Sequence, residues 1–461
     1  MTDTPSPAPR ATRRDASRLL LDAAHVMADM EEAGIAVDVG YLNDTAHRIE
    51  RQTLAIQRRL YEVPAVQRWR AREGRGFKLD GPQLADTLHV HERVPVKRHT
   101  PSGRPAIDEE ALKTAAVDAP WLNMLLRIRS LQKVRSTYLL GLIREEEGGF
   151  IHPFFNLHLA RTYRSSSDSP NFQNLPIRDP ELGPMVRRAF VTRPGRQLME
   201  IDFKGMEVSW AYCYHRDPAM RRYLLDKTLD LHRDMAAECF GLTAEEAAYK
   251  PVRYIGKNGF VFPVFYGSYW KVVAPAMWEA AAKVRLADGR PLLDVVRERL
   301  HIKTLEEFTE HIRQVEERFW NERFPIYNRW RRTWWETYLN RGWLDMLTGF
   351  RVEGTILERN QCINYPVQGS AFHCLLWTAI RLREWLRASG AKSLLIGQIH
   401  DSILLDAEPT EISGIVRGVN ALLKRRLPRE WPWCIIPMEI EVETTPVGGS
   451  WVDKKEWSET E

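Results

Sequence analysis

Two aspartates set among apolar residues are the side chains of this sequence best suited to metal chemistry. Asp202 ends the run Met199-Glu200-Ile201-Asp202-Phe203, and Asp401 lies between the apolar pairs at 394–395 and 403–404. One acidic residue at a strand end is usually a solvated turn. Two carboxylates at the end of one sheet would suit Mg²⁺, which takes oxygen ligands and binds one or two carboxylates plus substrate phosphates. The pair therefore predicts a site where two cations activate an attacking hydroxyl and neutralise a leaving oxygen.

A second group of residues is suited to binding an anion. Arg253 and Lys257 are four residues apart, so on a helix they share one face and could grip a triphosphate. Such pairs on helix surfaces are usually only solvated. Here an aromatic run follows directly, with rings at 260, 262, 265 and 266, and leaves the helix little polar surface. The aromatic run therefore strengthens the prediction of anion binding, which the Arg253 and Lys257 pair alone would leave weak.

The elements that must position these residues are strands far apart in the chain. Residues 198–203 read as a short strand, 394–407 as two strands joined at His400-Asp401, and 438–443 as a half-buried strand with alternating Glu. Residues 206–345 between the first two are mostly helical. The pattern predicts an α+β fold in which a helical block is inserted into one antiparallel sheet.

Composition limits the class of protein. The 461 residues carry 66 Lys plus Arg against 61 Asp plus Glu, a net charge of +5, which predicts only a weak general preference for polyanions. The five cysteines are scattered without a Cys-x-x-Cys pair, which argues against a disulfide framework or a zinc site. Residues 1–17 lack an apolar signal and predict a disordered tail. Without an 18-residue apolar stretch, we expect a cytoplasmic protein with no membrane contact.

Five segments, taken together and in order, resemble the motifs of family A DNA polymerases, the bacterial polymerase I type. Any one of them alone would be weak, but five in family order are specific. The similarity runs from about residue 18 to Trp451. The segments are the signature Arg164–Pro176, motif A at Asp202–Glu207, motif B at Arg253–Gly267, the stretch Asn364–Ala371, and motif C at Gln398–Asp401.

This resemblance implies a right-hand polymerase fold with an antiparallel-sheet palm, helical fingers and a helical thumb. We expect an N-terminal helix on the palm at 18–37, the thumb at 38–150, the palm at 151–231 and 346–461, and the fingers at 232–345. Residues 1–37 are too few for a proofreading or 5′-nuclease domain, which takes at least about 50 residues. The expectation is therefore a polymerase without either nuclease, of the kind that phages or plasmids use for replication or repair.

The resemblance also assigns roles at the site of nucleotide addition. Asp202 and Asp401 would hold two Mg²⁺ ions, for which Mn²⁺ could substitute. Glu207 would exclude a ribose 2′-hydroxyl, and Tyr266 would close over the nascent base pair. The residues implied to contact the incoming dNTP are Arg253, Lys257, His232, Glu207, Phe262 and Tyr266. Of these, Lys257 would also donate a proton to pyrophosphate.

The partners implied are primer-template DNA and dNTPs. Arg164, Gln368 and His400 would touch the primer terminus or the minor groove, and Asn364 would lie near the template strand. The sequence leaves open whether a separate exonuclease, helicase or processivity factor works with the chain.

Three positions depart from the family pattern. Gly205 stands where Gln is usual, so one contact that supports the sugar gate is missing. Ser402 follows Asp401 where Glu is usual, so a third carboxylate is absent at that position. One extra residue separates Lys257 from Phe262, with Pro263 following. This predicts a bulge or a kink in the motif B helix and leaves open whether Phe262 or Phe265 faces the sugar.

Two other functions remain to be weighed. Single-subunit RNA polymerases often carry His-Asp-Ser in motif C, as this chain does, but they use a small residue at the position of Glu207. A polymerase-like accessory subunit that only binds DNA would not need Asp202 and Asp401 together with Arg253 and Lys257. We therefore predict template-directed addition of dNTPs to a primer 3′-hydroxyl, with release of pyrophosphate.

Overall fold

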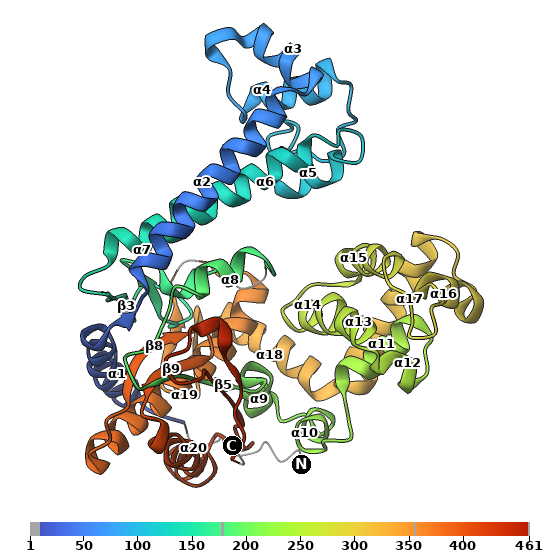
Figure 1. Ribbon diagram of the computed structural model, residues 1–461. Coiled ribbons are helices and arrows are strands. Elements are labelled where there is room, and N and C mark those ends of the chain that lie inside the picture. The colour runs from blue at the N-terminus through green and yellow to red at the C-terminus, as the bar shows by residue number, and fades with distance from the viewer. Residues whose placement is uncertain (1–9, 177–178, 355, 460–461) are drawn as a thin grey trace.

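The computed structural model describes residues 10–176, 179–354 and 356–459. Figure 1 shows three regions: a body built around a sheet, a long helical arm that rises from it, and a helical lobe beside it. The body combines strands from both halves of the chain. In the sequence, the arm lies between the short strands Ile35–Ala36 and Phe150–Ile151, and the lobe lies between the strands Gln197–Phe203 and Trp343–Asp345.

The main sheet has five antiparallel strands in the order β11-β10-β5-β9-β8. Its central strand β5 pairs with β10 on one side and β9 on the other, so Glu441 and Ser402 flank Asp202. The antiparallel sheet and the predicted α+β fold are confirmed, although the last predicted strand begins only at Ile440. The strands are β5 (Gln197–Phe203), β8 (Leu394–Ile399), β9 (Ser402–Ala407), β10 (Ile440–Thr444) and β11 (Lys455–Glu456).

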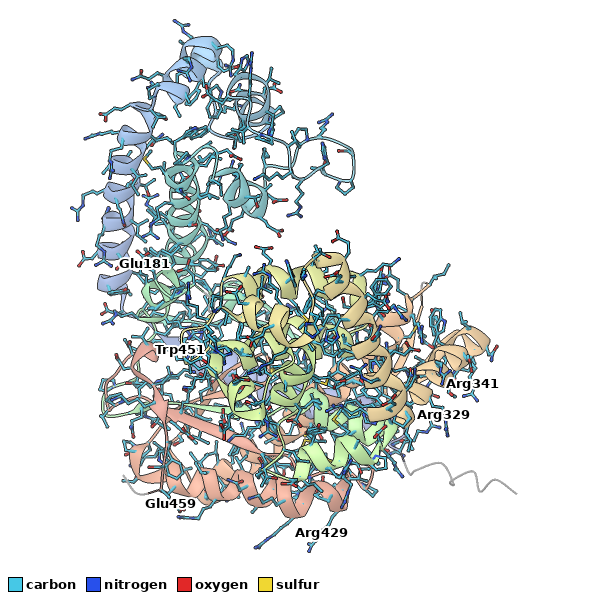
Figure 2. The ribbon with its side chains drawn as sticks, turned by 90° about the vertical axis from the view of Figure 1, so that its right-hand side faces the viewer. Glu181, Arg329, Arg341, Arg429, Trp451 and Glu459 are labelled. Atoms are coloured by element: carbon cyan, nitrogen blue, oxygen red, sulfur yellow. The ribbon has the colours of Figure 1, made fainter. Side chains whose placement is uncertain are left out.

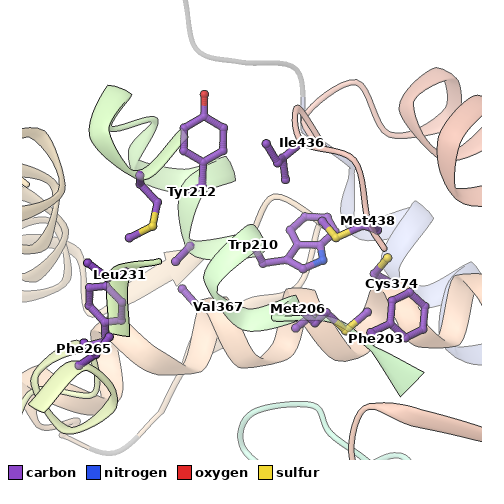
Figure 3. Close-up of a cluster of buried hydrophobic side chains, with 14 of the residues drawn as sticks. Phe203, Met206, Trp210, Tyr212, Leu231, Phe265, Val367, Cys374, Ile436 and Met438 are labelled. Carbon is purple, nitrogen blue, oxygen red and sulfur yellow. The ribbon is translucent and has the colours of Figure 1, made fainter. Parts of the chain in front are cut away.

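The two faces of this sheet differ because side chains alternate along each strand. Met199 and Ile201 of β5 point into the largest apolar core, whereas Glu200 and Asp202 lie on the opposite face. Figure 3 shows Trp210 beside Met206, Cys374 and Met438, and helices from both halves of the chain cover this apolar face. They are α1 (Arg13–Ala33), α9 (Met206–His215), α19 (Arg359–Ser389) and α20 (Ile412–Ala421).

The arm is a pair of antiparallel helices with a small tip. At the tip, Leu60, Trp69 and Leu122 belong to an apolar cluster distinct from the cores of the body. Figure 2 shows the tip standing clear of the other regions. The arm contains α2 (Val39–Tyr61), α3 (Pro64–Glu73), η1 (Gly74–Gly76), α4 (Pro82–Asp86), η2 (Thr87–His91), α5 (Glu109–Ala115), α6 (Leu122–Lys133), η3 (Val134–Leu139) and α7 (Leu140–Glu145).

The helical lobe shares the largest apolar core with the body, unlike the arm tip. Phe265 and Phe324 of the lobe lie in one cluster with Trp210 and Val367 of the body, so the lobe is packed firmly onto it. After α10 (Pro218–Leu225), the lobe contains α11 (Leu231–Phe240), α12 (Ala244–Ala248), α13 (Lys250–Ile255), η5 (Gly256–Val261), α14 (Phe262–Phe265), α15 (Trp270–Ala282), α16 (Leu292–Leu300), α17 (Leu305–Arg318), η6 (Phe319–Arg323) and α18 (Pro325–Arg341).

The remaining elements are short and either complete the body or link it to the arm and the lobe. Strand β1 pairs with β2, β3 with β4, and β6 with β7, each as an antiparallel pair. They are β1 (Ile35–Ala36), β2 (Phe150–Ile151), β3 (Phe154–Asn156), β4 (Ser166–Asp168), η4 (Phe172–Asn174), α8 (Leu182–Arg187), β6 (Trp343–Asp345), β7 (Arg351–Glu353), η7 (Pro409–Glu411), η8 (Leu422–Arg426), α21 (Leu427–Glu430) and η9 (Trp451–Asp453).

The N-terminal segment corrects one expectation. The predicted disordered tail over residues 1–17 is wrong in its last part, because α1 begins at Arg13. Thr12 and Asp15 cap that helix reciprocally, each side chain accepting a hydrogen bond from the other residue's backbone. Residues 1–9 lie outside the described residues. In the described part of the chain, no helix is both long and apolar enough to cross a membrane, and all five cysteines are free and buried.

Candidate active site

The two predicted metal-binding aspartates lie side by side at one end of the main sheet. Asp202 is the penultimate residue of β5, and Asp401 occupies the two-residue turn between β8 and β9. The register pairs Asp202 with Ser402, and the Phe203 N–H donates to the Asp401 carbonyl at 3.2 Å. His400 completes the turn with a left-handed φ of 48°. Pairing of β5 with β9 therefore brings together two carboxylates that are about 200 positions apart in the chain.

Negative charge accumulates around Asp202. Burial raises the pKa of its carboxyl to about 7, and the neighbouring Glu200, Asp401 and Glu441 add to this effect. In the described part of the chain, however, no three His, Cys, Asp or Glu side chains converge closely enough to hold a metal by themselves. A centre with only Asp202 and Asp401 as carboxylate ligands fits Mg²⁺, which takes few protein carboxylates and completes its shell with water and phosphate oxygens.

Arg164 links these acids to the predicted sugar gate. Its guanidinium donates to Glu207 and lies 3.6 Å from Asp401 Oδ1. Burial raises the pKa of Glu207, an effect that Arg164 opposes. Nearby, Gln398 of motif C accepts hydrogen bonds from Ser165 and Gln173, both at 2.6 Å. The signature segment and the metal turn are thus held together by buried polar contacts.

Gly205, the first departure from the family pattern, has a conformational explanation. It precedes α9 with φ of 55°, in the left-handed region where only glycine is unstrained. A Cβ built at this position would meet no atom within 4 Å. The glycine therefore allows the sharp turn from β5 into α9 that places Glu207 beside Arg164, and no side chain at this position supports the gate.

The predicted triphosphate-binding residues gather on one side of the helical lobe. Arg253 donates through Nε to Asp230 at 2.5 Å, which leaves its two terminal nitrogens available. Lys257 makes no ion pair within the described residues, and its Nζ lies 5.1 Å from the Phe262 ring centroid. The His232 ring meets Phe262 edge to face at 5.5 Å. Burial, Arg253 and Lys257 lower the pKa of His232 to about 4. The positive charges of Arg253 and Lys257 are therefore felt at His232 and could be neutralised by a bound anion.

The extra residue in motif B is absorbed by a π-helical segment, as the predicted bulge requires. This segment, η5, covers Gly256–Val261, so it contains Lys257 and ends directly before Phe262. Downstream, Phe265 is buried against the rings of Phe319, Phe324 and Tyr327. Phe262 instead contacts His232 and Lys257. The ring beside Lys257 and His232 is therefore Phe262.

The lobe meets the body across a small cavity. Glu207, Phe262, Tyr266 and Asn364 are among the residues that line it. Asn364 on α19 donates to the Tyr266 carbonyl at 3.0 Å, and Tyr266 is 40% exposed. Four predicted site residues from three segments, α9, motif B and α19, thus surround one space.

Two predicted residues are not joined to this network. Gln368 is half-buried on α19, and His400 is exposed at the tip of the β8–β9 turn. Among the described residues, neither side chain makes a hydrogen bond or ion pair. Both lie beside residues of the network, Gln368 one turn after Asn364 and His400 next to Asp401.

Comparison with known proteins agrees with this geometry. The sequence profile of DNA polymerase family A matches residues 46–453. This chain belongs to that family. A DNA polymerase I of Thermus thermophilus is 26% identical over 94% of this chain and 47% of its own length, and that of Pseudomonas aeruginosa is 26% identical over 92% and 43%. The chain therefore spans about half the length of these family A relatives.

A solved structure shows the same fold. The polymerase domain of Pol1 from M. smegmatis, in complex with DNA primer-template and dNTP, superposes with a TM-score of 0.72 at 24% identity. The alignment covers 94% of this chain and 70% of that one. This likeness confirms the polymerase fold that the sequence motifs predicted.

Sequence reasoning missed three functional candidates in this family A site. Asp230 holds Arg253 and also caps α11, accepting from the backbone of His232 at 3.0 Å. Glu200 and Glu441 add charge beside Asp202. Strand alternation could have placed Glu200 on the same face as Asp202, whereas the position of Glu441 depends on strand pairing. Position 402 carries a serine instead of a carboxylate, but Glu200 and Glu441 supply carboxylates near Asp202.

Proposed function

We propose that this chain is a DNA-directed DNA polymerase that adds dNTPs to a primer 3′-hydroxyl and releases pyrophosphate. One observation carries the proposal: Arg164 touches both Glu207 and Asp401, and Glu207 lines one cavity with Phe262 of the lobe. Paired carboxylates, sugar gate and anion-binding helix are thus parts of one site. In this proposal the body is the palm, the lobe the fingers and the arm the thumb.

Two Mg²⁺ ions fit the paired carboxylates, with Mn²⁺ as a substitute. Asp202 and Asp401 would hold them, together with phosphate oxygens and water. Bound there, the cations would activate the 3′-hydroxyl and neutralise charge on the leaving oxygen. The accumulated negative charge around Asp202 supports this assignment.

The lobe supplies the groups that orient the nucleotide. Arg253 and Lys257 bind the triphosphate by charge-assisted hydrogen bonds, and Lys257 donates a proton to the departing pyrophosphate. His232 is neutral near pH 7 and contacts the same phosphates as a hydrogen-bond donor. Phe262 and Tyr266 confine the sugar and the base.

Glu207 decides between a DNA and an RNA polymerase. Its half-buried carboxylate, held by Arg164, fills the space that a ribose 2′-hydroxyl would need. This argues against the single-subunit RNA polymerase that Ser402 suggested. The full set of charged site residues argues against an inactive accessory subunit.

Primer-template DNA is the second substrate. Arg164, Gln368 and His400 border the turn and helix where a primer end would lie, and Asn364 borders the template side. Because bacterial DNA is cytoplasmic, we propose that the enzyme acts there. A separate exonuclease, helicase or processivity factor is compatible with this assignment.

Primer extension tests the proposal. The wild-type protein with Mg²⁺, a primed template and dNTPs should extend the primer. Asp202→Ala and Asp401→Ala should each reduce the rate by roughly a thousandfold or more while leaving primer-template binding within about twofold, because they remove metal ligands. Asp288→Ala, an exposed aspartate of the lobe, is the matched control. Mg²⁺-dependent synthesis by either active-site variant at the wild-type rate would refute the metal assignment.

A further inference from the structure

Glu200 is a half-buried carboxylate that the proposed reaction does not use directly. It lies two residues before Asp202 on β5, so both side chains project from the same face of the sheet. Its side chain is 13% exposed. Three donors surround it: Ser402 Oγ at 3.0 Å, Trp451 Nε1 at 3.0 Å and Lys454 Nζ at 2.5 Å. A carboxylate held by so many donors is fixed in position and keeps its charge.

Lys454 belongs to a C-terminal segment that packs against β5. Its Nζ also lies 2.6 Å from Glu443, which faces Glu200 in the β5–β10 register. Just before it, Trp451 stacks on Phe172 with centroids 5.6 Å apart. Figure 2 shows Trp451 near the base of the arm. The segment 451–454 is therefore anchored by packing, and Lys454 is held against Glu200.

Ser402 connects this ion pair to the metal turn. It is the register partner of Asp202 and immediately follows Asp401. Its hydroxyl contacts Glu200 and also the Ile399 carbonyl at 2.9 Å, across the turn that carries Asp401. Through Ser402, Glu200 is linked to Asp202 and Asp401, the proposed metal ligands, although it is not proposed as a ligand itself.

From these contacts we propose that Glu200 and Lys454 are positioning residues that set how tightly divalent cations bind at Asp202 and Asp401. The proposal rests on the proposed function. The negative charge of Glu200 attracts the cations and Lys454 opposes it, and both act through partly buried protein where charges are poorly screened. Glu200 in this way supplies, from the neighbouring strand, charge that the serine at position 402 does not.

A purely structural ion pair would behave differently. Breaking a buried pair from either side leaves an unpaired charge and destabilises the protein, so both single variants would change in the same direction. An electrostatic role instead predicts opposite changes in cation affinity. The sign of the change therefore separates the two explanations.

The experiment measures Mn²⁺ binding by electron paramagnetic resonance, with the protein bound to a dideoxy-terminated primer-template and the matching dNTP. Glu200→Gln keeps the size of the side chain and should weaken Mn²⁺ binding by about threefold or more. Lys454→Met should strengthen it by a similar factor. The double variant, in which the buried pair is replaced by neutral groups, should fold and return close to the wild-type affinity.

Asp406→Asn is the matched control. Asp406 is also nearly buried and ion-paired, to Arg193 at 2.5 Å, on the same strand as Ser402 but at its far end. This variant should lower the thermal stability and leave Mn²⁺ affinity unchanged. Shifts of Glu200→Gln and Lys454→Met in the same direction, or an unchanged affinity in both, would overturn the proposal. If the wild-type protein binds no Mn²⁺, the proposed function itself fails.

Discussion

At the scale of single residues, two arginines of this site are held by carboxylates before any substrate binds. Arg164 contacts Glu207, and Arg253 contacts Asp230. Each pair orients one group that the proposed reaction uses. The substrate would then meet side chains whose positions are already restricted, which reduces the entropy lost on binding.

Removal of the gate carboxylate should admit ribonucleotides. Glu207→Ala opens the space beside Phe262, so rNTP incorporation relative to dNTP should rise by about 30-fold or more, corresponding to roughly 2 kcal/mol. Glu207→Gln retains the size of the side chain and should keep most of the selectivity. Competition between rNTP and dNTP in primer extension measures the ratio. A wild-type enzyme that already uses rNTPs well would contradict the gate.

His232 should report the binding of the triphosphate. Its folded pKa of about 4 lies below the ordinary 6.5, so the neutral ring contributes stability above pH 6.5, which is lost as the pH falls toward 4. An anion beside Arg253 and Lys257 offsets their charge and should raise this pKa. Histidine NMR titration with and without a dNTP measures the shift. Titration of the free enzyme near 6.5, or no change on dNTP binding, would exclude His232 from the site.

At the scale of secondary-structure elements, close packing of glycine holds the π-helical segment against its neighbour. A Cβ at Gly256 would lie 2.4 Å from the His232 carbonyl oxygen and 2.8 Å from the Ala236 Cβ. The segment η5 therefore depends on glycine to reach α11. This approach places Lys257 and Phe262 beside His232.

Gly256→Ala should separate these two helices. Overpacking against a backbone atom costs about 1–3 kcal/mol, and the KM for dNTP should rise because His232 and Lys257 move apart. Gly259→Ala is the matched control in the same segment. Its Cβ would meet mainly the flexible Met277 side chain at 2.9 Å, so its effect should be smaller. Thermal unfolding and steady-state kinetics compare the two, and equal effects would contradict the packing argument.

At the scale of the whole molecule, the regions differ in how they are stabilised. The lobe shares the largest core with the body, whereas the tip of the arm has a core of its own. The tip can therefore lose structure without disturbing the site. If the arm is a thumb that holds DNA, a change at its tip would then affect DNA binding more than the rate of nucleotide addition.

Trp69→Ala tests this division. Trp69 is fully buried at the arm tip, and its truncation should cost about 3–5 kcal/mol locally. Hydrogen exchange should rise in residues 62–125 but not in β5 or β9. Primer-template dissociation should become faster, while kcat at saturating DNA stays within about twofold of wild type. Loss of protection throughout the body would show that the tip is not independent.

Local patterns were sufficient to predict much of this protein. Alternation and apolar runs placed β5, β8 and β9, and motif spacing predicted a bulge or kink near Lys257 and Phe262, because these signals lie within a few neighbouring residues. Only the tertiary structure decided that Phe262 and not Phe265 lies beside Lys257 and His232. It also brought Glu441, Asp230 and Lys454 to their partners. Strand register and contacts over some 200 positions depend on the packing of the whole chain, which local sequence does not encode.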